Sequence, residues 1–501
     1  MSHLKKGGAI LVDSSLKGCA AIVTMLQERT STIRLLTINS AKGFIFTFDV
    51  PSNSLFRNFR FLGGGLIESF IIKLTVIDAM GNSRLPICEN KQKRTESAQT
   101  FYDEAKIQNQ IWIDSAVGSR NIFTPSVANF SLFHKEQAYK FLGNMMKPPF
   151  DHETIRVIEY LQKLFKPGVS WSCDLGLILM PNIVNSIGLS KYLSQPGADV
   201  HAAYCKSIAN AINLFLFKKV FHFDLHGENA MIQTTAAGDI NSFIIDFGRA
   251  MDISKDAMPG SSYLQTDDEL NQVREISREL ANNFIASKLS DDAVKANVIL
   301  ETMKSLKAID NHQHTKIYPN YNRFRYQMGW MNPVIEEPDF PAQQKLLLCI
   351  YNKVADDYYI DLTTSTPPLQ KSTIAGYIRE NKLIDFTQGI DTFYCTDPRM
   401  SPSPPPVSTF IPPPASTAST SATFVPPPAS TSATASPASP SAKRQRTFLG
   451  GRKSFYRSAR CPGRRSFYRS ARCPGRKSFA TRKKMRKPKL KKNTKRMGKR
   501  Y

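Results

Sequence analysis

The chain lacks the features that mark membrane-spanning and secreted proteins. Its 501 residues contain no run of about 18 uninterrupted apolar residues, the length that a spanning helix requires. The opening stretch MSHLKKGGAILVDSSLKG has no long apolar core of the kind found in secretory signals. The eight cysteines are scattered, without a C-x-x-C pair. These absences predict a soluble, intracellular protein with reduced thiols and no membrane contact.

Acidic residues are missing from one long region, residues 443–501. Of the 67 Lys and Arg residues, 25 lie there, so residues 1–442 carry 42 basic and 41 acidic side chains. A repeat fills part of this tail, with GRKSFYRSARCP at 451–462 and GRRSFYRSARCP at 463–474. Each unit offers only one Phe-Tyr pair to a core, so we expect disorder until the tail meets a polyanion. The basic charges and interleaved aromatics favour nucleic acid as that partner.

Composition divides the rest of the chain. Residues 398–442 are Pro, Ser, Thr and Ala with a near repeat, TFIPPPAST and TFVPPPAST, which predicts a disordered linker. Earlier residues mix strand-like and helical patterns, with strands concentrated early and helices late, so we expect an α+β fold. The predicted organisation is an extension (1–34), a β-rich lobe (35–180), a helical lobe (181–397), the linker (398–442) and the basic tail (443–501).

Short apolar runs rich in β-branched and aromatic residues predict the strands. Helical spacing, together with a capping box at TDDE from Thr266 to Glu269, predicts the helices. The expected strands are 31–38, 43–50, 69–77, 175–180 and 242–246, and the expected helices are 96–113, about 199–219 and one that follows Thr266.

The stretch FHFDLHGEN, residues 221–229, concentrates polar side chains behind an apolar approach. Two apolar stretches around TTAAGD follow it and predict a hairpin that returns Asp246 toward this loop. Phosphoryl transfer needs one carboxylate to accept the hydroxyl proton, and an amide oxygen and a second carboxylate to hold Mg²⁺. Asp224, Asn229 and Asp246 supply these three groups. A polar loop with ordinary hydrogen bonds is the plainer alternative.

The same residues resemble the protein-kinase superfamily. HFDLHGEN aligns without gaps with the catalytic loop H-R-D-L-K-x-x-N, and IIDFG with the D-F-G magnesium loop. The resemblance implies a bilobal kinase-like fold that uses ATP and Mg²⁺. It implies Asp224 as the catalytic base, with His222 and His226 beside it, and Asn229 and Asp246 as magnesium ligands.

The resemblance also implies an ATP-anchoring lysine on an early strand, paired with a glutamate on the next helix. Lys73 in ESFIIKLTVID and Glu104 in FYDEAKIQNQIW meet this order. Read singly, they are a surface lysine at a strand end and a solvated helical carboxylate. The helix face expected to turn inward consists of Phe101, Ala105, Gln108 and Ile111.

Two further parts of the nucleotide site are assigned by resemblance. The turn in TINSAKGFIF provides small residues for the phosphate loop, namely Ser40, Ala41 and Gly43. GGGL at 63–66 has more glycines but lies too close to the lysine strand. The strand LGLILMPNI resembles the one against which adenine packs, which places Met180 to Asn182 at the hinge; a plain core strand explains its apolar part equally well.

The chain departs from the family pattern in several places. His226 stands where serine/threonine kinases usually carry lysine, and no A-P-E motif follows the D-F-G. Asp267 or Asp268 is the candidate for the aspartate that braces the catalytic loop. With its serine-rich basic tail, the chain is most similar to the divergent serine/threonine kinases of large cytoplasmic DNA viruses, of iridovirus type. That similarity implies a place in the host cytoplasm or the virion.

The leading hypothesis is therefore an ATP- and Mg²⁺-dependent serine/threonine protein kinase that phosphorylates its own tail or other basic proteins around packaged DNA. A kinase for small hydroxyl compounds is a second hypothesis, favoured by Gly227 and the missing A-P-E. A catalytically inactive, DNA-binding structural protein is the third. The candidate acceptors in the tail are Ser454, Ser458, Ser466 and Ser470.

Overall fold

The protein is described here by a computed structural model, and its described residues form mixed α and β structure within one unit, residues 1–409. Among them, no helix is both long and apolar enough to cross a membrane. Ala41, the GGGL stretch, most of the linker and the whole basic tail lie outside the described residues. The described residues are 18–27, 32–37, 40, 42–49, 69–85, 93–118, 121–146, 151–255, 266–317, 327–337, 343–357, 375–376, 378–379 and 383–400.

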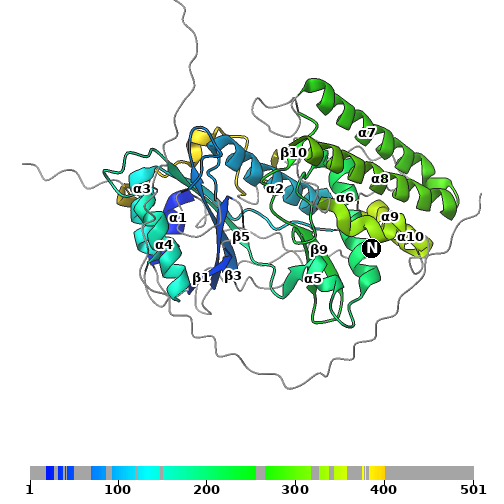
Figure 1. Ribbon diagram of the computed structural model, residues 1–501, viewed down its shortest axis with the longest axis horizontal. Helices are drawn as coiled ribbons and strands as arrows, with labels where there is room; N and C mark the ends of the chain where they lie inside the picture. The colour runs from blue at the N-terminus through cyan, green and yellow to red at the C-terminus, as the bar shows by residue number, and fades with distance from the viewer. Residues whose placement is uncertain are drawn as a thin grey trace, which may run out of the picture. The chain divides into compact units, whose positions relative to one another are not determined.

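A five-stranded antiparallel sheet organises the N-terminal half (Figure 1). Its strand order is β1-β2-β3-β5-β4. The four strands predicted for this half are confirmed, whereas β4 escaped prediction because its sequence, NFSLF, is short and only partly β-branched. The strands are β1 (Ile33–Thr37), β2 (Gly43–Asp49), β3 (Ser69–Ile77), β4 (Asn129–Phe133) and β5 (Asp174–Pro181).

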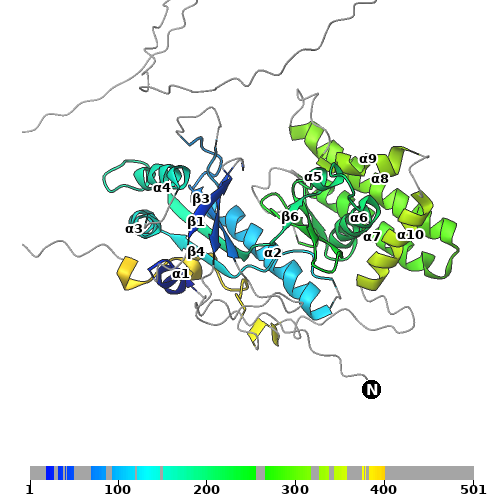
Figure 2. The ribbon, with the colours of Figure 1, turned by 90° about the horizontal axis from the view of Figure 1, so that it is seen from below.

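Helices cover both faces of this sheet. On one face, α1 (Gly18–Gln27), α3 (Lys135–Met145) and α4 (His152–Leu164) share a buried cluster with the strands (Figures 1 and 2). On the other, α2 (Ala98–Gly118) packs against β5. The face of α2 predicted to turn inward is confirmed as buried, with exposures of 2% or less for all four residues. The sheet thus holds α2 against the side that carries the candidate site.

The C-terminal half of the described chain is built around α6 (Val200–Leu216), which is buried along most of its length. It contacts three other long helices, and the four share one apolar cluster (Figure 2). The predicted cap is confirmed, because the Thr266 side chain accepts a hydrogen bond from the Glu269 N–H at 3.2 Å. The remaining elements are α5 (Leu189–Leu193), α7 (Asp267–Ala286), η3 (Ser287–Leu289), α8 (Asp292–Ile317), η4 (Gln327–Met331), α9 (Asn332–Glu336) and α10 (Gln343–Asp357).

Two small antiparallel sheets frame the polar stretch at 221–229. β8 (Ala230–Thr234) and β9 (Ile240–Ile244) form the predicted hairpin, with β6 (Ser186–Gly188) beside them. β7 (Val220–Phe221) pairs with β10 (Met251–Asp252). The two sheets hold the loop before β8 and the residues after β9 close together.

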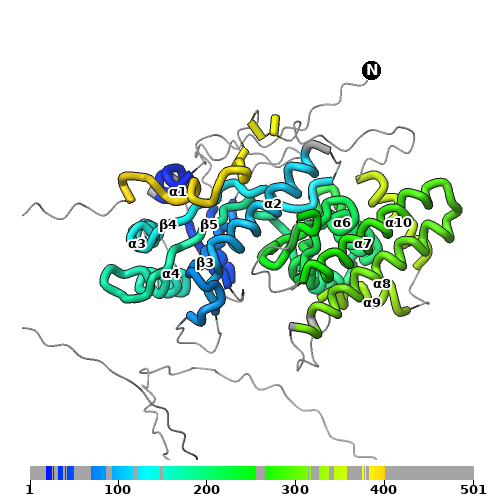
Figure 3. The backbone as a smooth tube through the Cα atoms, turned by 90° about the horizontal axis from the view of Figure 1, so that it is seen from above, coloured from blue at the N-terminus to red at the C-terminus, as the bar shows by residue number. Residues whose placement is uncertain are grey.

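Residues 383–400 return to the N-terminal sheet, although the predicted boundaries assign most of them to the helical lobe. The Cys395 N–H donates to Leu132 O of β4 at 2.7 Å, and the Tyr102 hydroxyl of α2 donates to Gln388 O at 2.8 Å. Figure 3 shows this segment, with η5 (Ile390–Phe393) and η6 (Pro398–Met400), passing α1 and α2. The C-terminal segment therefore supports the outer side of α2.

The cysteines differ from expectation. Cys19 is paired with Cys395 and Cys205 with Cys349 as disulfides, while Cys173 is free and buried. The prediction of reduced thiols is therefore wrong for these four residues. Sequence separations of 376 and 144 residues carry no framework pattern, because only folding brings the partners together.

Candidate active site

Lys73 lies at the centre of the candidate site. It occupies the middle of β3, opposite Ile45 of β2 and Ile178 of β5. Its Nζ donates to Glu104 Oε1 of α2 at 2.5 Å and to Asp246 Oδ1 at 3.0 Å. One ammonium thus joins the sheet, α2 and the segment after β9.

The electrostatics of this triad follow from burial and from mutual charge. The Lys73 side chain is 9% exposed and that of Glu104 is 2% exposed. Burial raises the pKa of Glu104 to about 7, against the opposing charge of Lys73. Burial would lower the pKa of Lys73, but the charges of Asp246 and Glu104 raise it instead. Lys73 therefore stays cationic, and its charge holds the pKa of Asp246 at about 2.

Asn229 and Asp224 are linked within the loop at residues 221–229. The Asn229 side-chain amide donates to Asp224 O at 2.8 Å, and Asn229 O accepts from the Ile245 N–H at 3.0 Å. Two residues here lie in the left-handed backbone region, Phe223 with φ 55° and Asp246 with φ 61°. Such conformations are strained in residues other than glycine and occur often at functional sites. The loop is thus held in one shape by its own backbone bonds.

Asp224 has two side-chain partners. Arg249, directly after the D-F-G, places Nη1 3.4 Å from Asp224 Oδ1, and the Gln327 side chain donates a hydrogen bond to the carboxylate. Burial raises the pKa of Asp224, while Arg249 lowers it. The Asp224 side chain is 17% exposed, so an acceptor hydroxyl can approach it. Both partners favour the anionic form that accepts a proton.

His222 is a buried structural histidine. It is 1% exposed, its Nε2 lies 3.0 Å from Ile245 O, and its ring packs against Phe247 with centroids 5.0 Å apart. Burial lowers the pKa of His222 to about 4, so the ring is neutral at pH 7. His222 therefore supports the D-F-G segment and has no direct access to a substrate.

His226 lies on the solvent side of the same loop. Its backbone N–H donates to Asp224 O at 2.9 Å, and its Nδ1 accepts from the Glu228 N–H at 3.2 Å. In the neutral ring, the proton then sits on Nε2 and remains free to be donated. Next to it, a Cβ on Gly227 would lie 2.0 Å from Ser190 Oγ. Packing against α5 therefore requires glycine at 227, whatever the acceptor.

The residues present fit a magnesium ion. Mg²⁺ prefers oxygen ligands and usually takes one or two from protein, with water and phosphate oxygens completing its shell. The Asn229 amide nitrogen is used within the loop, so its Oδ1 is the atom available as a ligand. The Asp246 side chain is 39% exposed and anionic. The described residues hold no group of three or more His, Cys, Asp or Glu side chains suited to a metal.

The predicted phosphate turn lies beside Lys73. Ser40 Oγ accepts from the Gly43 N–H at 3.1 Å, which closes the turn between β1 and β2. A Cβ on Gly43 would lie 3.1 Å from Lys73 Cε and 3.2 Å from Lys73 Cγ, so glycine gives the lysine stem its space. Ala41, the third residue assigned to this turn, lies outside the described residues.

The two hinge candidates have different surroundings. Met180 lies against α2, where its Sδ accepts from Gln108 Nε2 at 3.8 Å. The Asn182 backbone N–H donates to Ser69 O at 3.0 Å, and its side-chain amide donates to Ser69 Oγ at 2.9 Å. Asn182 therefore fastens the end of β5 to the start of β3, and its N–H is already engaged.

The loop at residues 221–229 is braced by η4, which the sequence did not predict. Asp267 and Asp268 are exposed at the start of α7, so the assignment of either as the brace is wrong. The Trp330 Nε1–H of η4 instead donates to Leu225 O at 2.9 Å. Asp310 of α8 is fully buried and accepts from the Met328 N–H at 3.4 Å, and burial raises its pKa to about 7. Helix α8 thereby holds η4, and η4 holds the loop.

Sequence reasoning missed Arg249, Gln327, Trp330 and Asp310. Arg249 directly follows the D-F-G and could have been found from that position alone. Gln327 and Trp330 lie about a hundred residues beyond the loop in a stretch without a motif, so no signal pointed to them.

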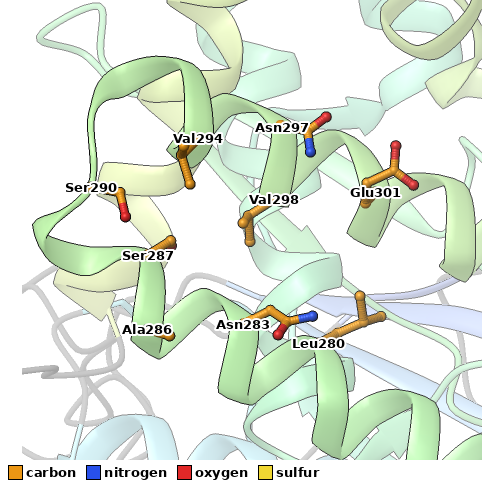
Figure 4. A pocket seen from close by; sticks show the side chains of 9 residues that line it. All are labelled: Leu280, Asn283, Ala286, Ser287, Ser290, Val294, Asn297, Val298 and Glu301. Atoms are coloured by element: carbon orange, nitrogen blue, oxygen red, sulfur yellow. The ribbon is translucent and has the colours of Figure 1, made fainter.

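A surface pocket between α7 and α8 lies outside this site (Figure 4). None of the candidate catalytic residues contributes to it. Its lining consists of Leu280, Asn283, Ala286, Ser287, Ser290, Val294, Asn297, Val298 and Glu301.

Comparisons with known proteins add little to this geometry. No protein-family model matches the chain. No curated protein matches it either. Among solved structures, the chain is similar to one described as WaaP in complex with acyl carrier protein, at 11% identity and a TM-score of 0.25, over 59% of this chain and 92% of that chain. A TM-score this low carries no argument, so the chemistry must rest on the residues themselves.

Proposed function

We propose that the protein is an ATP- and Mg²⁺-dependent phosphotransferase with a bilobal, protein kinase-like architecture. The observation that carries the proposal is the triad at Lys73, whose ammonium contacts both Glu104 and Asp246 across three separate segments of the chain. A buried lysine held between two carboxylates, beside a loop that offers a base and an amide oxygen, suits phosphate binding and transfer.

Each residue of the candidate site has a proposed role in phosphate transfer. Lys73 binds ATP phosphate oxygens and is oriented by Glu104, while Asn229 and Asp246 hold Mg²⁺. When bound, the metal offsets the negative charge of the phosphates. The acceptor oxygen bonds to the γ-phosphorus as the bond to the β–γ bridging oxygen breaks. ADP leaves, and the hydroxyl proton passes to the Asp224 carboxylate.

Arg249 and His226 fit the same scheme. Protein kinases usually carry a lysine two residues after the catalytic aspartate, and here that position is His226. The Arg249 guanidinium, 3.4 Å from Asp224 Oδ1, supplies a permanent positive charge next to the proposed base. His226 Nε2 offers a hydrogen-bond donor from the same loop as Asp224. Together they replace the missing ammonium near the transferring phosphate.

For the acceptor, we propose serine and threonine hydroxyls of proteins, as in the viral kinases that the sequence resembles. Gly227, which had favoured small-molecule acceptors, is required by its contact with Ser190 and so says nothing about the acceptor. The serines of the basic tail are close in sequence to arginines, and their phosphorylation would reduce the tail's positive charge.

Phosphate transfer from γ-labelled ATP tests the acceptor class. The full chain is incubated with Mg²⁺ and, in parallel, a generic basic protein, the 443–501 peptide, and a mixture of sugars and amino alcohols. We expect label on protein, with mass spectrometry placing it on Ser454, Ser458, Ser466 or Ser470, and none with Asp224→Ala. Label confined to small hydroxyl compounds would make the protein a small-molecule kinase. No transfer to any acceptor would leave an inactive scaffold.

We further propose that residues 443–501 bind nucleic acid through phosphate neutralisation. Binding of a mixed-sequence DNA duplex by the full chain should weaken steeply as salt rises, and a chain ending at residue 442 should bind little at any salt concentration. Equal binding by both chains would rule the tail out as the contact.

A further inference from the structure

Two lysines besides Lys73 meet at the turn between β1 and β2. Lys93, from the connection between β3 and α2, donates its Nζ to Ser40 O at 2.8 Å and to Gly43 O at 2.6 Å. It is 3% exposed, and its ammonium lies 4.3 Å from the centroid of the Phe44 ring. This ammonium is committed to the backbone on both sides of the turn. Lys93 therefore holds the turn in place over the Lys73 stem.

Lys42 belongs to the turn itself and has a different environment. Its Nζ forms an ion pair with Glu96, which lies two residues before the start of α2. The Lys42 side chain is 33% exposed, whereas that of Glu96 is 5% exposed. Lys42 can therefore leave its partner for another anion without unpacking a core.

Glu96 connects this pair to the candidate site. Burial raises the pKa of Glu96, the charges of Lys42 and Lys73 lower it, and the charge of Asp246 raises it. The turn and the triad thus form one electrostatic group. Besides Lys93, whose ammonium is committed to the backbone, it contains two cations, Lys42 and Lys73, and three carboxylates, which belong to Glu96, Glu104 and Asp246.

Because the carboxylates of this group already pair with its cations, an ATP triphosphate bound here would have few positive side chains to contact. Lys73 already faces two carboxylates, and its side chain is only 9% exposed. Of the two cations, Lys42 is the more exposed and sits on the turn that the sequence assigns to phosphate binding. An ammonium is a good point-charge ligand for phosphate, and a long flexible stem lets it change partner.

We propose that Lys42 is a nucleotide-phosphate ligand that rests on Glu96 and moves to the β- or γ-phosphate when ATP binds, while Lys93 keeps the turn above the site. This inference rests on the proposed function, because it requires a nucleotide at Lys73. Glu96 is then the resting partner that keeps Lys42 close to the site.

Equilibrium binding of ATP, ADP and AMP without Mg²⁺ tests the inference, with wild type and Lys42→Ala compared by calorimetry. Arg34→Ala is the matched control, because Arg34 lies on the same hairpin in an exposed pair with Asp49. We expect Lys42→Ala to weaken ATP binding about tenfold and ADP binding by a similar factor, with AMP unchanged within about twofold. Lys42→Arg should restore most of the affinity, and Arg34→Ala should match wild type.

Glu96→Gln gives the opposite test. Freed from its resting partner, Lys42 should bind ATP as tightly as in wild type or a few-fold more tightly. Unchanged ATP binding by Lys42→Ala, or equal losses for ATP and AMP, would overturn the inference while leaving the proposed function intact. A wild-type protein that binds no ATP would instead overturn the proposed function, and the inference with it.

Discussion

The two sides of the candidate site are held together by different forces. On the sheet side, Lys73 and Glu104 fix each other through an ion pair with little exposure. On the loop side, the backbone oxygens of Asp224 and Leu225 accept neutral hydrogen bonds from the side chains of Asn229 and Trp330. A buried ion pair is costly to break because the partner left behind stays charged in a poor solvent. A neutral hydrogen bond contributes only about 1 kcal/mol when removed.

The difference suggests a division of tasks. Ion pairs on the sheet side keep a cation charged and ready for phosphate. On the loop side, the Asn229 side chain bonds to the Asp224 backbone through its nitrogen, which leaves the Asn229 amide oxygen available to a metal. Changes on the sheet side should therefore affect both stability and nucleotide binding, whereas changes on the loop side should affect turnover.

Removing the central cation should have the largest effect. Lys73→Met should reduce transfer by about a hundredfold or more and, at pH 8, reduce the free energy of unfolding by about 3 kcal/mol. The buried Glu104 takes up a proton as pH falls, since its folded pKa lies above its unfolded one. The stability loss should therefore be smaller at pH 5. Urea unfolding and transfer rates at both pH values measure this.

A double variant separates the two effects of that change. Adding Glu104→Gln to Lys73→Met should return most of the stability at pH 8 but none of the transfer activity. Equal stability losses at pH 5 and pH 8 in the single variant would contradict the ion-pair account of the sheet side.

Lowering the pH should reduce the free energy of unfolding through protonation of His222. Its folded pKa of about 4 lies below the ordinary value of 6.5, so the unfolded state binds more protons between these values. Stability from this group is complete above pH 6.5 and declines by about 3 kcal/mol as pH falls toward 4. Unfolding of His222→Gln across this range should show a flatter pH profile. His134→Gln, at an exposed histidine, should keep the wild-type slope, and identical slopes in all three proteins would contradict the assignment.

A smaller effect is expected from crowding Lys73. Gly43→Ala places a Cβ 3.1 Å from Lys73 Cε, so the lysine stem must shift. We expect the KM for ATP to rise about tenfold, with a smaller change in kcat. Gly389→Ala, where a Cβ would meet no atom within 4 Å, is the control. An unchanged KM in Gly43→Ala would mean that Lys73 does not bind the nucleotide.

The smallest effect should come from the loop brace. Trp330→Phe removes the hydrogen bond to Leu225 O and keeps most of the ring. Loss of one neutral hydrogen bond costs about 1 kcal/mol, which corresponds to a kcat lower by roughly fivefold. The KM for ATP should stay unchanged. Trp171→Phe, in the cluster beside the sheet, should leave kcat at the wild-type value. A KM effect in Trp330→Phe would place the brace with nucleotide binding instead.

How far the sequence predicts this site depends on how local each feature is. Asp224, Asn229 and Asp246 lie in one loop–hairpin–loop segment, and Lys73 and Glu104 match the order that the kinase resemblance implies. All five could be proposed without a structure, and the structure pairs Lys73 with Glu104 and Asp246, and Asn229 with Asp224. The strands and the capped helix were equally accessible, because their patterns complete within a few residues.

Features that depend on distant segments could not be assigned. Trp330 reaches the 221–229 loop only because η4 folds back onto it, and Asp310 of α8 holds η4 through the Met328 N–H. Lys93 reaches the phosphate turn from a connection with no motif. Asp267 and Asp268 were chosen because of their place at a helix start, yet α7 carries them into solvent. Tertiary packing determines such contacts, and no short stretch of sequence specifies them.

The role of Asp224 as the base can be tested by comparing Asp224→Asn with wild type on the same preparations, with both the dissociation constant for ATP and the rate of phosphate transfer recorded. We expect ATP binding within about threefold of wild type and transfer reduced by about a thousandfold, because Asp224 acts on the acceptor proton alone. Transfer that survives the substitution, or a loss of transfer matched by an equal loss of ATP binding, would contradict it.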